Sequence, residues 1–586
     1  MKKKSVFSCL LLVLLTSCSQ DSFIRSDKIK VMVEDSELYT VDSPIREILP
    51  GSDVSFTIRF LYGSSFLSCS YPSYSVEKGD GTKCTLTLKD VFYPSVISLS
   101  CSKGSLTYHS SSSLFLDGTD TRREPFQGYH LREHALDGYE VLNGRDGYLL
   151  SSWNTEEDLS GEDVYFNNRV PYGVKDLYPH YEKVSPLSDF TFSVDADGAC
   201  VTSYKGKDDK VVLPSSYNGS AVYKISTGAF SSSSLKELYL PSSVKRIEKD
   251  AFLNSSLEEM TFADSLNEID QNAFKGSPLK TVHINAVTPP HASGTYYDAF
   301  TDKIDYLDSV RGEKKIVLFG GSSVRYGYYS PLFEEAFSEY KTVDMGVFAY
   351  VNMKPQLSVI ASYMNPGDIL IHAPEYDYWA LDEQFGTDRK FEENLFYFFE
   401  GNYASLSLID IQDYPDFFFG YTHYQRRRSS LASLDYSYTS NHRDDDFNYH
   451  QEKTYNLEGD YILEREGHDR DEHIYQPLTP YTLETITEDR ISNLNSIYQS
   501  LSQKGIRVFY AYAPKNHKAI TDESTYEKRN ELEAYLQKHL SVPILGKLED
   551  SLYPGTSFYL IDNHLSSKAA KGHTEYVINE LRKVIG

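Results

Sequence analysis

Residues Lys315–Gly327 read KIVLFGGSSVRYG, and this stretch decides how we interpret the C-terminal half of the chain. A short apolar run breaks at two glycines, two serines follow, and Ser330-Pro331 provides a helix start shortly afterwards. The pattern predicts a strand, a tight turn and a helix. Because an open α/β sheet places its ligands at the carboxyl ends of its strands, a serine in this turn is a candidate for chemistry. A flexible glycine-serine loop has the same composition, and the far end of the chain is what favours the first interpretation.

That far end is the segment FYLIDNHLSSKAAKGHTEYVINEL, residues 558–581, which places Asp562 and His564 on a loop before an amphipathic helix. A serine hydroxyl becomes a nucleophile when a base removes its proton, and a carboxylate in turn orients the base. A serine early in the domain, followed by an acid and a histidine late in it, supplies these three groups.

The two segments resemble the SGNH, or GDSL-type, hydrolases, a family of serine esterases and acyl transferases on a flavodoxin-like sheet. The resemblance covers residues 305–586. It implies Ser322 as the nucleophile, with Ser323 as the alternative register, His564 as the base and Asp562 as the acid that orients it. Asp562 precedes His564 by two positions, where three is the more usual spacing in the family.

The resemblance also implies an oxyanion hole, in which backbone amides stabilise the charge that develops on the substrate oxygen. Val343–Gly346, VDMG, resembles the second block of the family and implies the amide of Gly346 as a donor beside the amide of Ser322. Gly367–Glu375, GDILIHAPE, resembles the strand that leads to the third block. The asparagine donor of that block is missing and Glu375 stands in its neighbourhood, so the implied oxyanion hole lacks one donor.

The composition indicates a globular chain of several domains and disfavours one class of partner. At roughly 150 residues per domain, a chain of 586 residues forms about four units. Lys and Arg number 58 against 84 Asp and Glu, which gives a net charge of -26. Nucleic acid is therefore not an expected partner, because its binding needs a clustered basic surface. The dense basic run Arg426–Arg428 is predicted to be a solvated face.

Residues 1–17 have a lysine-rich start and a short apolar core, which predicts a secretion signal that is too short to span a membrane. Leu15–Cys18, LTSC, resembles a bacterial lipobox. This implies a lipid on Cys18 and an extracytoplasmic protein anchored to the membrane at the cell surface. Ordinary cleavage near Cys18 without a lipid is the alternative.

Residues 18–120 contain short β-type runs between Gly, Pro and Ser clusters, and several such runs predict a small β-sandwich of immunoglobulin-like type. Cys69, Cys84 and Cys101 lie close together in this domain, and Cys200 follows later. Either a disulfide among the first three or small buried thiols fits this arrangement. The spacing does not resemble a zinc site.

Residues 121–184 resemble the small β-grasp repeat of internalin-type bacterial surface proteins. Asp146–Thr155, DGYLLSSWNT, and Asp176–Tyr181, DLYPHY, carry the resemblance. It implies that Trp153 packs in a very small core. Tyr181 replaces the tryptophan that usually ends the motif.

Residues 185–290 contain a clear internal repeat, in which Phe230, Phe252 and Phe274 recur every 22 residues and a leucine follows each. This period predicts a leucine-rich solenoid of about three copies, each burying its face on its neighbours. The copies resemble the leucine-rich repeats of bacterial cell-surface proteins, which implies a spacer or a recognition surface for a protein partner. Thr288–Pro290 is expected to end the stack and begin a linker.

Residues 291–586 alternate strand and helix patterns, as a doubly wound parallel sheet requires. A polar insertion between residues 421 and 480 is expected to form a lid or a substrate wall where it is ordered. Asp444–Asp446 and His468–His473 are rich in metal-binding residue types. Charged loops produce such clusters by composition alone, so we expect no metal site.

These patterns predict a multidomain fold: N-terminal all-β modules, a short leucine-rich solenoid, and a C-terminal α/β flavodoxin-like domain of SGNH type with a parallel sheet. The function we expect is that of a membrane-anchored serine esterase or acyl transferase, without a cofactor, acting on acylated envelope or extracellular glycan. One alternative is a non-catalytic adhesin or glycan- or protein-binding lipoprotein with a degenerate hydrolase domain. The other is a wall-assembly factor that transfers or escorts acyl groups without hydrolysing them.

Overall fold

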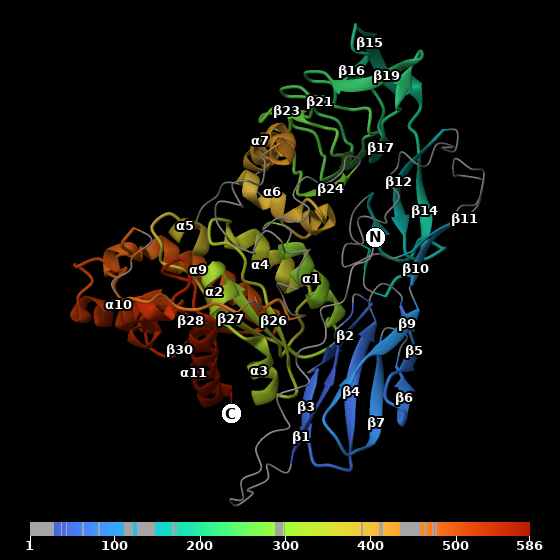
Figure 1. Ribbon diagram of the computed structural model, residues 1–586. Coiled ribbons are helices and arrows are strands. Elements are labelled where there is room, and N and C mark those ends of the chain that lie inside the picture. The colour runs from blue at the N-terminus through green and yellow to red at the C-terminus, as the bar shows by residue number, and fades with distance from the viewer. Residues whose placement is uncertain are drawn as a thin grey trace, which may run out of the picture. The chain divides into compact units, whose positions relative to one another are not determined.

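The protein is described by a computed structural model, in which the chain forms two compact units, Met1–Arg59 with Phe66–Cys101, and Phe60–Ser65 with Ser102–Gly586 (Figure 1). Each unit is described on its own. No helix among the described residues has the length and apolar character needed to cross a bilayer. The described residues are 28–585 without 35, 37, 43, 61–63, 80–82, 103, 110–120, 126–146, 167–169, 172, 287–296, 298, 388–390, 410–413, 434–457, 462–463, 472–473 and 475–476.

Some of the predicted features lie outside these described residues. They include the secretion signal and Cys18, the end of the repeats at Thr288–Pro290, and the acidic run Asp444–Asp446. Among the residues that the structure does describe, no group of three or more His, Cys, Asp or Glu side chains has an arrangement that could hold a metal ion.

The first unit consists of two main sheets and a strand pair. Along one central strand, Val54, Phe56 and Ile58 are all buried, the period of two expected when one face of a sheet is covered. Cys84 and its neighbours Cys69 and Cys101 are free thiols, so the structure favours the second of the two alternatives, thiols without a disulfide. The strand orders are β3 (Ile45–Ile48), β1 (Ile29–Val33), β8 (Ser95–Ile97); β2 (Tyr39–Asp42), β4 (Ser52–Phe60), β7 (Lys83–Val91), β6 (Tyr74–Lys78); and β5 (Ser65–Cys69) with β9 (Leu99–Ser102).

A five-stranded sheet begins the second unit. Trp153 is fully buried in its core and packs edge-on against Tyr108, with ring centroids 5.0 Å apart, which confirms the predicted core position of this tryptophan. Tyr108 belongs to a strand of this sheet, although the sequence pattern places it in the preceding domain, which is predicted to end at residue 120. The strand order is β11 (Thr121–Pro125), β10 (Ser105–His109), β14 (Asp176–Lys183), β12 (Tyr148–Asn154), β13 (Asp163–Val164).

The repeats form a solenoid with two ladders of short strands. The register pairs Leu238 with Met260 and Met260 with Val282, which reproduces the 22-residue period seen in the sequence. One ladder has the order β17 (Lys210–Val212), β20 (Glu237–Tyr239), β22 (Glu259–Ala263), β24 (Thr281–Asn285). The other has the order β15 (Phe190–Val194), β16 (Ala199–Tyr204), β19 (Ser220–Ile225), β21 (Arg246–Ile247), β23 (Glu268–Ile269), and β18 (Ser216–Tyr217) pairs with β19. The strands are parallel except where β15 pairs with β16 and β18 pairs with β19.

A stack of phenylalanine rings runs along the inside of the solenoid. The ring centroids of Phe230 and Phe252 are 5.0 Å apart, and those of Phe252 and Phe274 are 5.1 Å apart. The next ring in the stack is Phe418, whose centroid lies 4.8 Å from that of Phe274 and which comes from helix α7 (Tyr414–Ser433). Because a solenoid must cover its last repeat, α7 acts as the cap.

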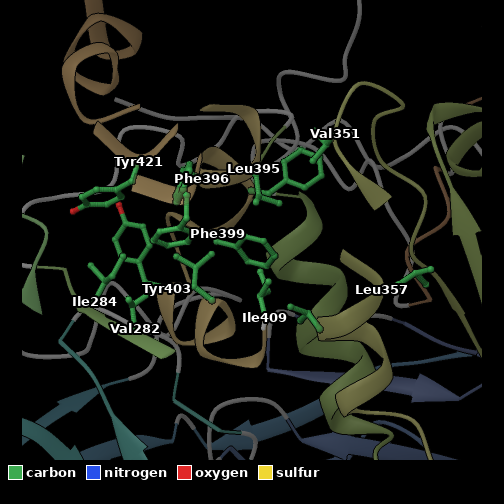
Figure 2. Packing of buried hydrophobic residues seen from close by; sticks show 14 of the residues in the cluster. Val282, Ile284, Val351, Leu357, Leu395, Phe396, Phe399, Tyr403, Ile409 and Tyr421 are labelled. Atoms are coloured by element: carbon green, nitrogen blue, oxygen red, sulfur yellow. The ribbon is translucent and has the colours of Figure 1, made fainter. Parts of the chain in front are cut away.

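The cap continues one hydrophobic core from the repeats into the C-terminal domain. Figure 2 shows Val282 and Ile284 of β24 next to Tyr403 of the short helix η4 (Tyr403–Leu408), with Phe396 of α6 (Glu393–Phe399) close by. Part of the polar insertion, which the sequence predicts to be a lid or a substrate wall, is therefore a helix that packs on the solenoid.

Arg428 of α7 corrects the prediction that the basic run is a solvated face. Arg428 is 4% exposed, and its guanidinium makes ion pairs with Asp264 of the solenoid at 2.8 Å and with Glu400 at 3.1 Å. Arg426 and Arg427 are exposed, as predicted. The difference arises because successive residues of a helix face different directions, and of the three arginines it is Arg428 that faces Asp264 and Glu400.

The C-terminal domain is built on a five-stranded parallel sheet of order β26 (Lys341–Asp344), β25 (Lys315–Gly320), β27 (Ile369–Ala373), β28 (Arg507–Ala511), β30 (Ile544–Leu545). In chain order this is 2-1-3-4-5, one of the common orders of doubly wound sheets. Its parallel strands and alternation with helices agree with the prediction.

Helices cover both faces of this sheet. Ile316 and Leu318 of β25 pack against α2 (Ser322–Gly327), α3 (Ser330–Ala336) and α11 (Ser567–Ile585). Val317 and Phe319, which face the other side, join the cluster that contains α1 (Ala299–Ser309), α4 (Met353–Ser362) and α9 (Glu488–Gln503). Such double coverage explains why the strand is a continuous apolar run. The domain also contains α5 (Leu381–Gln384), α10 (Tyr526–His539), and the pair β29 (Lys515–Asn516) with β31 (Leu552–Tyr553).

Candidate functional site

The predicted site lies at the carboxyl edge of the parallel sheet. β25 ends at Gly320, and Ser322 begins α2 after a single further glycine. A Cβ atom on Gly321 would lie 2.5 Å from Oε1 of Glu375 and 2.8 Å from the Cα atom of Ala349. Only glycine therefore allows the segments after the neighbouring strands to approach this turn so closely.

Ser322 and Ser323 differ in exposure and in contacts. Ser322 retains 8% of its surface, and its hydroxyl donates a long hydrogen bond of 3.4 Å to Oε1 of Glu375. Ser323 is fully buried, and its amide donates to the same oxygen at 2.7 Å. Since a nucleophile must reach substrate, the exposure favours Ser322 as the candidate of the two.

A buried polar network lies next to Ser322. Asn563 donates a hydrogen bond to Oε2 of Glu375 at 3.0 Å and another to Asp377. Asp377 also accepts hydrogen bonds from Nζ of Lys515 at 2.8 Å and from the hydroxyl of Thr479 at 2.9 Å. The network thereby joins segments that follow β27 and β28 to the C-terminal loop.

The two carboxylates of this network differ in acidity. Burial, with the charge of Asp377 in second place, raises the pKa of Glu375 to about 7. Burial also acts to raise the pKa of Asp377, but the charge and hydrogen bond of Lys515 outweigh it and hold that pKa below its ordinary value. Near neutral pH, Asp377 is therefore ionised and Glu375 exchanges its proton.

His564 lies beside the helix that Ser322 begins. Its ring stacks on Tyr326, with centroids 4.0 Å apart, and Tyr326 is one helical turn after Ser322. Both ring nitrogens of His564 are buried and have no hydrogen-bond partner in the structure. Burial, followed by the charges of Arg325 and Arg465, holds the pKa of His564 well below its ordinary value, so its imidazole is neutral.

The hydrogen-bonded chain expected from Asp562 through His564 to Ser322 is not formed in this structure. Asp562 is fully buried, and its carboxylate accepts a hydrogen bond of 2.8 Å from the side chain of Asn516, whose amide also donates to the carbonyl of Asp562 at 2.9 Å. These paired bonds hold the acid on β29. Asp562, which precedes His564 by two positions, thus binds Asn516 and does not orient the histidine.

The amide of Gly346 is also engaged elsewhere. It donates to the carboxylate of Asp344 at 2.7 Å, and the carbonyl of Gly346 accepts from Nζ of Lys303 at 2.6 Å. The structure thus departs from the expected oxyanion hole, because the amide of Gly346 already donates its hydrogen bond to the side chain of Asp344.

Sequence reasoning missed four members of the polar network, Asp377, Thr479, Lys515 and Asn563. One signal for Asn563 was its position between the two predicted catalytic residues. Asp377 had a similar signal, since it follows Glu375 by two positions. No local pattern marks Lys515, which joins the network only because β28 lies beside β27.

Two exposed aromatic side chains follow the network directly. Tyr378 is 71% exposed and Trp379 is 65% exposed, and their rings are nearly perpendicular, with centroids 5.3 Å apart. Since consecutive Cα atoms are about 3.8 Å apart, Trp379 lies within about 15 Å of Glu375. The chain has two tryptophans, and the other, Trp153, is fully buried.

Comparison with known proteins identifies one part of the chain. A leucine-rich repeat protein of T. pallidum (TpLRR) is 26% identical over 17% of this chain and 71% of that protein, with a TM-score of 0.13. A leucine rich cell surface protein of Faecalibacterium prausnitzii is 16% identical over 28% of this chain and 43% of that protein, with a TM-score of 0.14. No curated protein matches the chain significantly. Residues 211–304 match the family model of the BspA type leucine rich repeat region in six copies, so this segment is a BspA-type leucine-rich repeat region.

Proposed function

We propose that the protein is a cell-surface lipoprotein that binds an extracellular glycan at the carboxyl edge of its parallel sheet. The observation that carries this proposal is the exposed pair Tyr378 and Trp379 beside the polar network around Glu375. The lipobox-like sequence before Cys18 and the BspA-type repeats support the location at the surface.

The chemistry of the edge suits sugar rings. An aromatic ring offers a flat apolar surface against which the C–H face of a pyranose can pack, while neighbouring polar groups hydrogen-bond its hydroxyls. A net charge of -26 disfavours polyanionic polymers. Uncharged or acylated glycan is therefore the partner we propose. In this proposal the solenoid, with its α7 cap, supports the domain whose sheet edge binds the glycan.

A protein partner bound through the solenoid is the other form of this proposal. Such a partner would face the ladder of strands that ends at β24. Part of this ladder is already covered by the chain itself, because Tyr165 stacks on His283 of β24 with centroids 4.8 Å apart. The amide of Phe166 also donates to Asn285 at 2.9 Å. The covered strands favour the α/β edge over the repeats as the place where a partner binds.

Binding of acetylated and deacetylated wall glycans to the wild type and to Trp379→Ala tests the proposal. Tryptophan fluorescence is a direct readout, because the second tryptophan is buried and the emission of Trp379 should change when a sugar stacks on it. We expect Trp379→Ala to lose about 1 kcal/mol or more of binding free energy, the order found for a packed aromatic ring. Phe419→Ala, an exposed aromatic on α7, serves as the matched control. Equal binding by both variants and the wild type would refute the proposed surface.

The second candidate function is ester hydrolysis or acyl transfer at Ser322, without a cofactor. It is favoured by the contact of the Ser322 hydroxyl with a carboxyl group and by the stacking of His564 on Tyr326, which lies one helical turn after Ser322. Labelling by a fluorophosphonate probe tests it. We expect the wild type to be labelled and Ser322→Ala not to be. Loss of the label in Ser323→Ala alone would instead move the nucleophile by one position, and an unlabelled wild type would exclude this function.

A further inference from the structure

We propose that Glu375, rather than His564, accepts the proton of the Ser322 hydroxyl. This inference rests on the second candidate function and names a catalytic residue for it. Serine-dependent ester chemistry requires a base within hydrogen-bonding reach of the nucleophile, and in this chain the group within reach is a carboxylate.

The geometry around Glu375 is that of a built site. Glu375 is 3% exposed. Its Oε1 accepts hydrogen bonds from the hydroxyl of Ser322 and from the amide of Ser323. Its second oxygen is held by Asn563. The absence of a Cβ atom on Gly321 opens the space that the carboxyl group occupies. The carboxyl group is thus fixed from both sides with one oxygen against the serine hydroxyl.

The 3.4 Å distance from Ser322 to Glu375 is longer than a strong hydrogen bond. Catalytic hydrogen bonds are often long without substrate and shorten when the site is filled. The serine hydroxyl has three staggered positions, and rotation between them changes this distance.

The acidity of Glu375 suits the role. A base is most effective when its pKa is close to the working pH, and burial together with Asp377 raises the pKa of Glu375 to about 7. Four titratable groups interact with Glu375 among the residues that the structure describes: Asp377, Lys515, Tyr350 and Tyr481. Lys515 lowers the pKa of Glu375 and Asp377 raises it, so the ion pair between them limits the net effect.

His564 has a different environment. Arg325 and Arg465 both act against a positive charge on the imidazole, and neither ring nitrogen has a hydrogen-bond partner. A proton placed on this ring would stay buried between like charges. The stacking on Tyr326 indicates that His564 packs α2 in position.

The proposed step begins with the ionised carboxylate of Glu375. It takes the hydroxyl proton while Oγ of Ser322 bonds to the acyl carbon and the carbonyl π electrons move onto the substrate oxygen. When the carbonyl re-forms, the bond from the acyl carbon to the sugar oxygen breaks, and Glu375 returns the proton to that oxygen. Water then repeats the sequence on the acyl-serine, releasing the acid and restoring Ser322.

The test measures the rate of fluorophosphonate labelling of the full-length protein from acidic to mildly alkaline pH. The wild-type rate should rise with pH through about 7, as Glu375 loses its proton. Glu375→Gln should be slower by about 10²- to 10⁴-fold and should lose this rise, because an amide cannot accept the proton. Glu375→Asp should retain part of the rate with an altered pH profile. Glu334→Gln, which changes another buried carboxyl of the same domain, should label at the wild-type rate.

Three outcomes separate the inference from the function beneath it. Labelling that is lost in Ser322→Ala but unchanged in Glu375→Gln, with the same pH profile, would overturn the inference and leave the esterase function standing. Labelling abolished by His564→Gln and retained in Glu375→Gln would assign the base to His564. An unlabelled wild type would remove the function itself. Thermal melting shows whether Glu375→Gln is folded. If it is not, the pH profile of labelling in Glu375→Asp tests the inference: an altered profile supports it, and the wild-type profile overturns it.

Discussion

Replacing Phe418 with alanine tests whether α7 caps the solenoid. Phe418 is 1% exposed and its ring stacks on Phe274 at 4.8 Å. Truncating a fully buried phenylalanine costs about 3–5 kcal/mol, and the stacked pair accounts for about 0.5–1.5 kcal/mol of that loss. The loss should fall on the last repeat, because solenoid stability is a sum of terms between neighbouring units.

The matched control is the next residue, Phe419, which is 62% exposed on the same helix. Phe419→Ala should change the unfolding free energy by about 0.5 kcal/mol or less. Urea unfolding gives the free energies, and hydrogen exchange followed by mass spectrometry shows whether the amides of the last repeat lose protection. Equal effects of the two substitutions, or unchanged protection of that repeat in Phe418→Ala, would refute the capping role.

Three further predictions concern the buried charges and the turn before Ser322. Arg428→Met should destabilise the protein by about 3–5 kcal/mol in urea unfolding, because it removes the cation that pairs with two buried carboxylates, whereas Arg427→Met should have little effect. Since the pKa of Glu375 is raised to about 7 in the folded state from 4.5, its contribution to stability is complete below about pH 4.5 and is lost as the pH rises through about 7. In Glu375→Gln, the urea midpoint should not fall as the pH rises through about 7. The same fall in the variant as in the wild type would contradict this prediction. Gly321→Ala should cost about 1–3 kcal/mol in thermal or urea unfolding through the clash at its Cβ atom, while Gly312→Ala, with nothing within 4 Å, should not.

The repeats show what a periodic sequence specifies. Phe230, Phe252 and Phe274 recur at a fixed interval, and an interval shared by all copies permits one arrangement in which every copy packs on the next. The stacked rings confirm this prediction. The cap was not predictable in the same way, because Phe418 lies in a distant helix and belongs to no repeat.

Arg428 illustrates the same division for a charged residue. In the sequence it is one of three consecutive arginines, and composition favours solvent for all three. Its burial depends on Asp264 and Glu400, which only the packing of α7 on the solenoid brings together.

For the candidate site, the chain by itself determined that Ser322 and Glu375 each follow a buried strand. Strand and turn patterns are local, so they can be recognised without knowledge of the fold. The tertiary structure decided which side chain each polar group meets: Glu375 for Ser322, Asn516 for Asp562, and Tyr326 for His564. Hydrogen bonds and ring contacts depend on distances of a few tenths of an ångström between segments far apart in the chain, and those distances are set by the packing of the whole sheet and its helices.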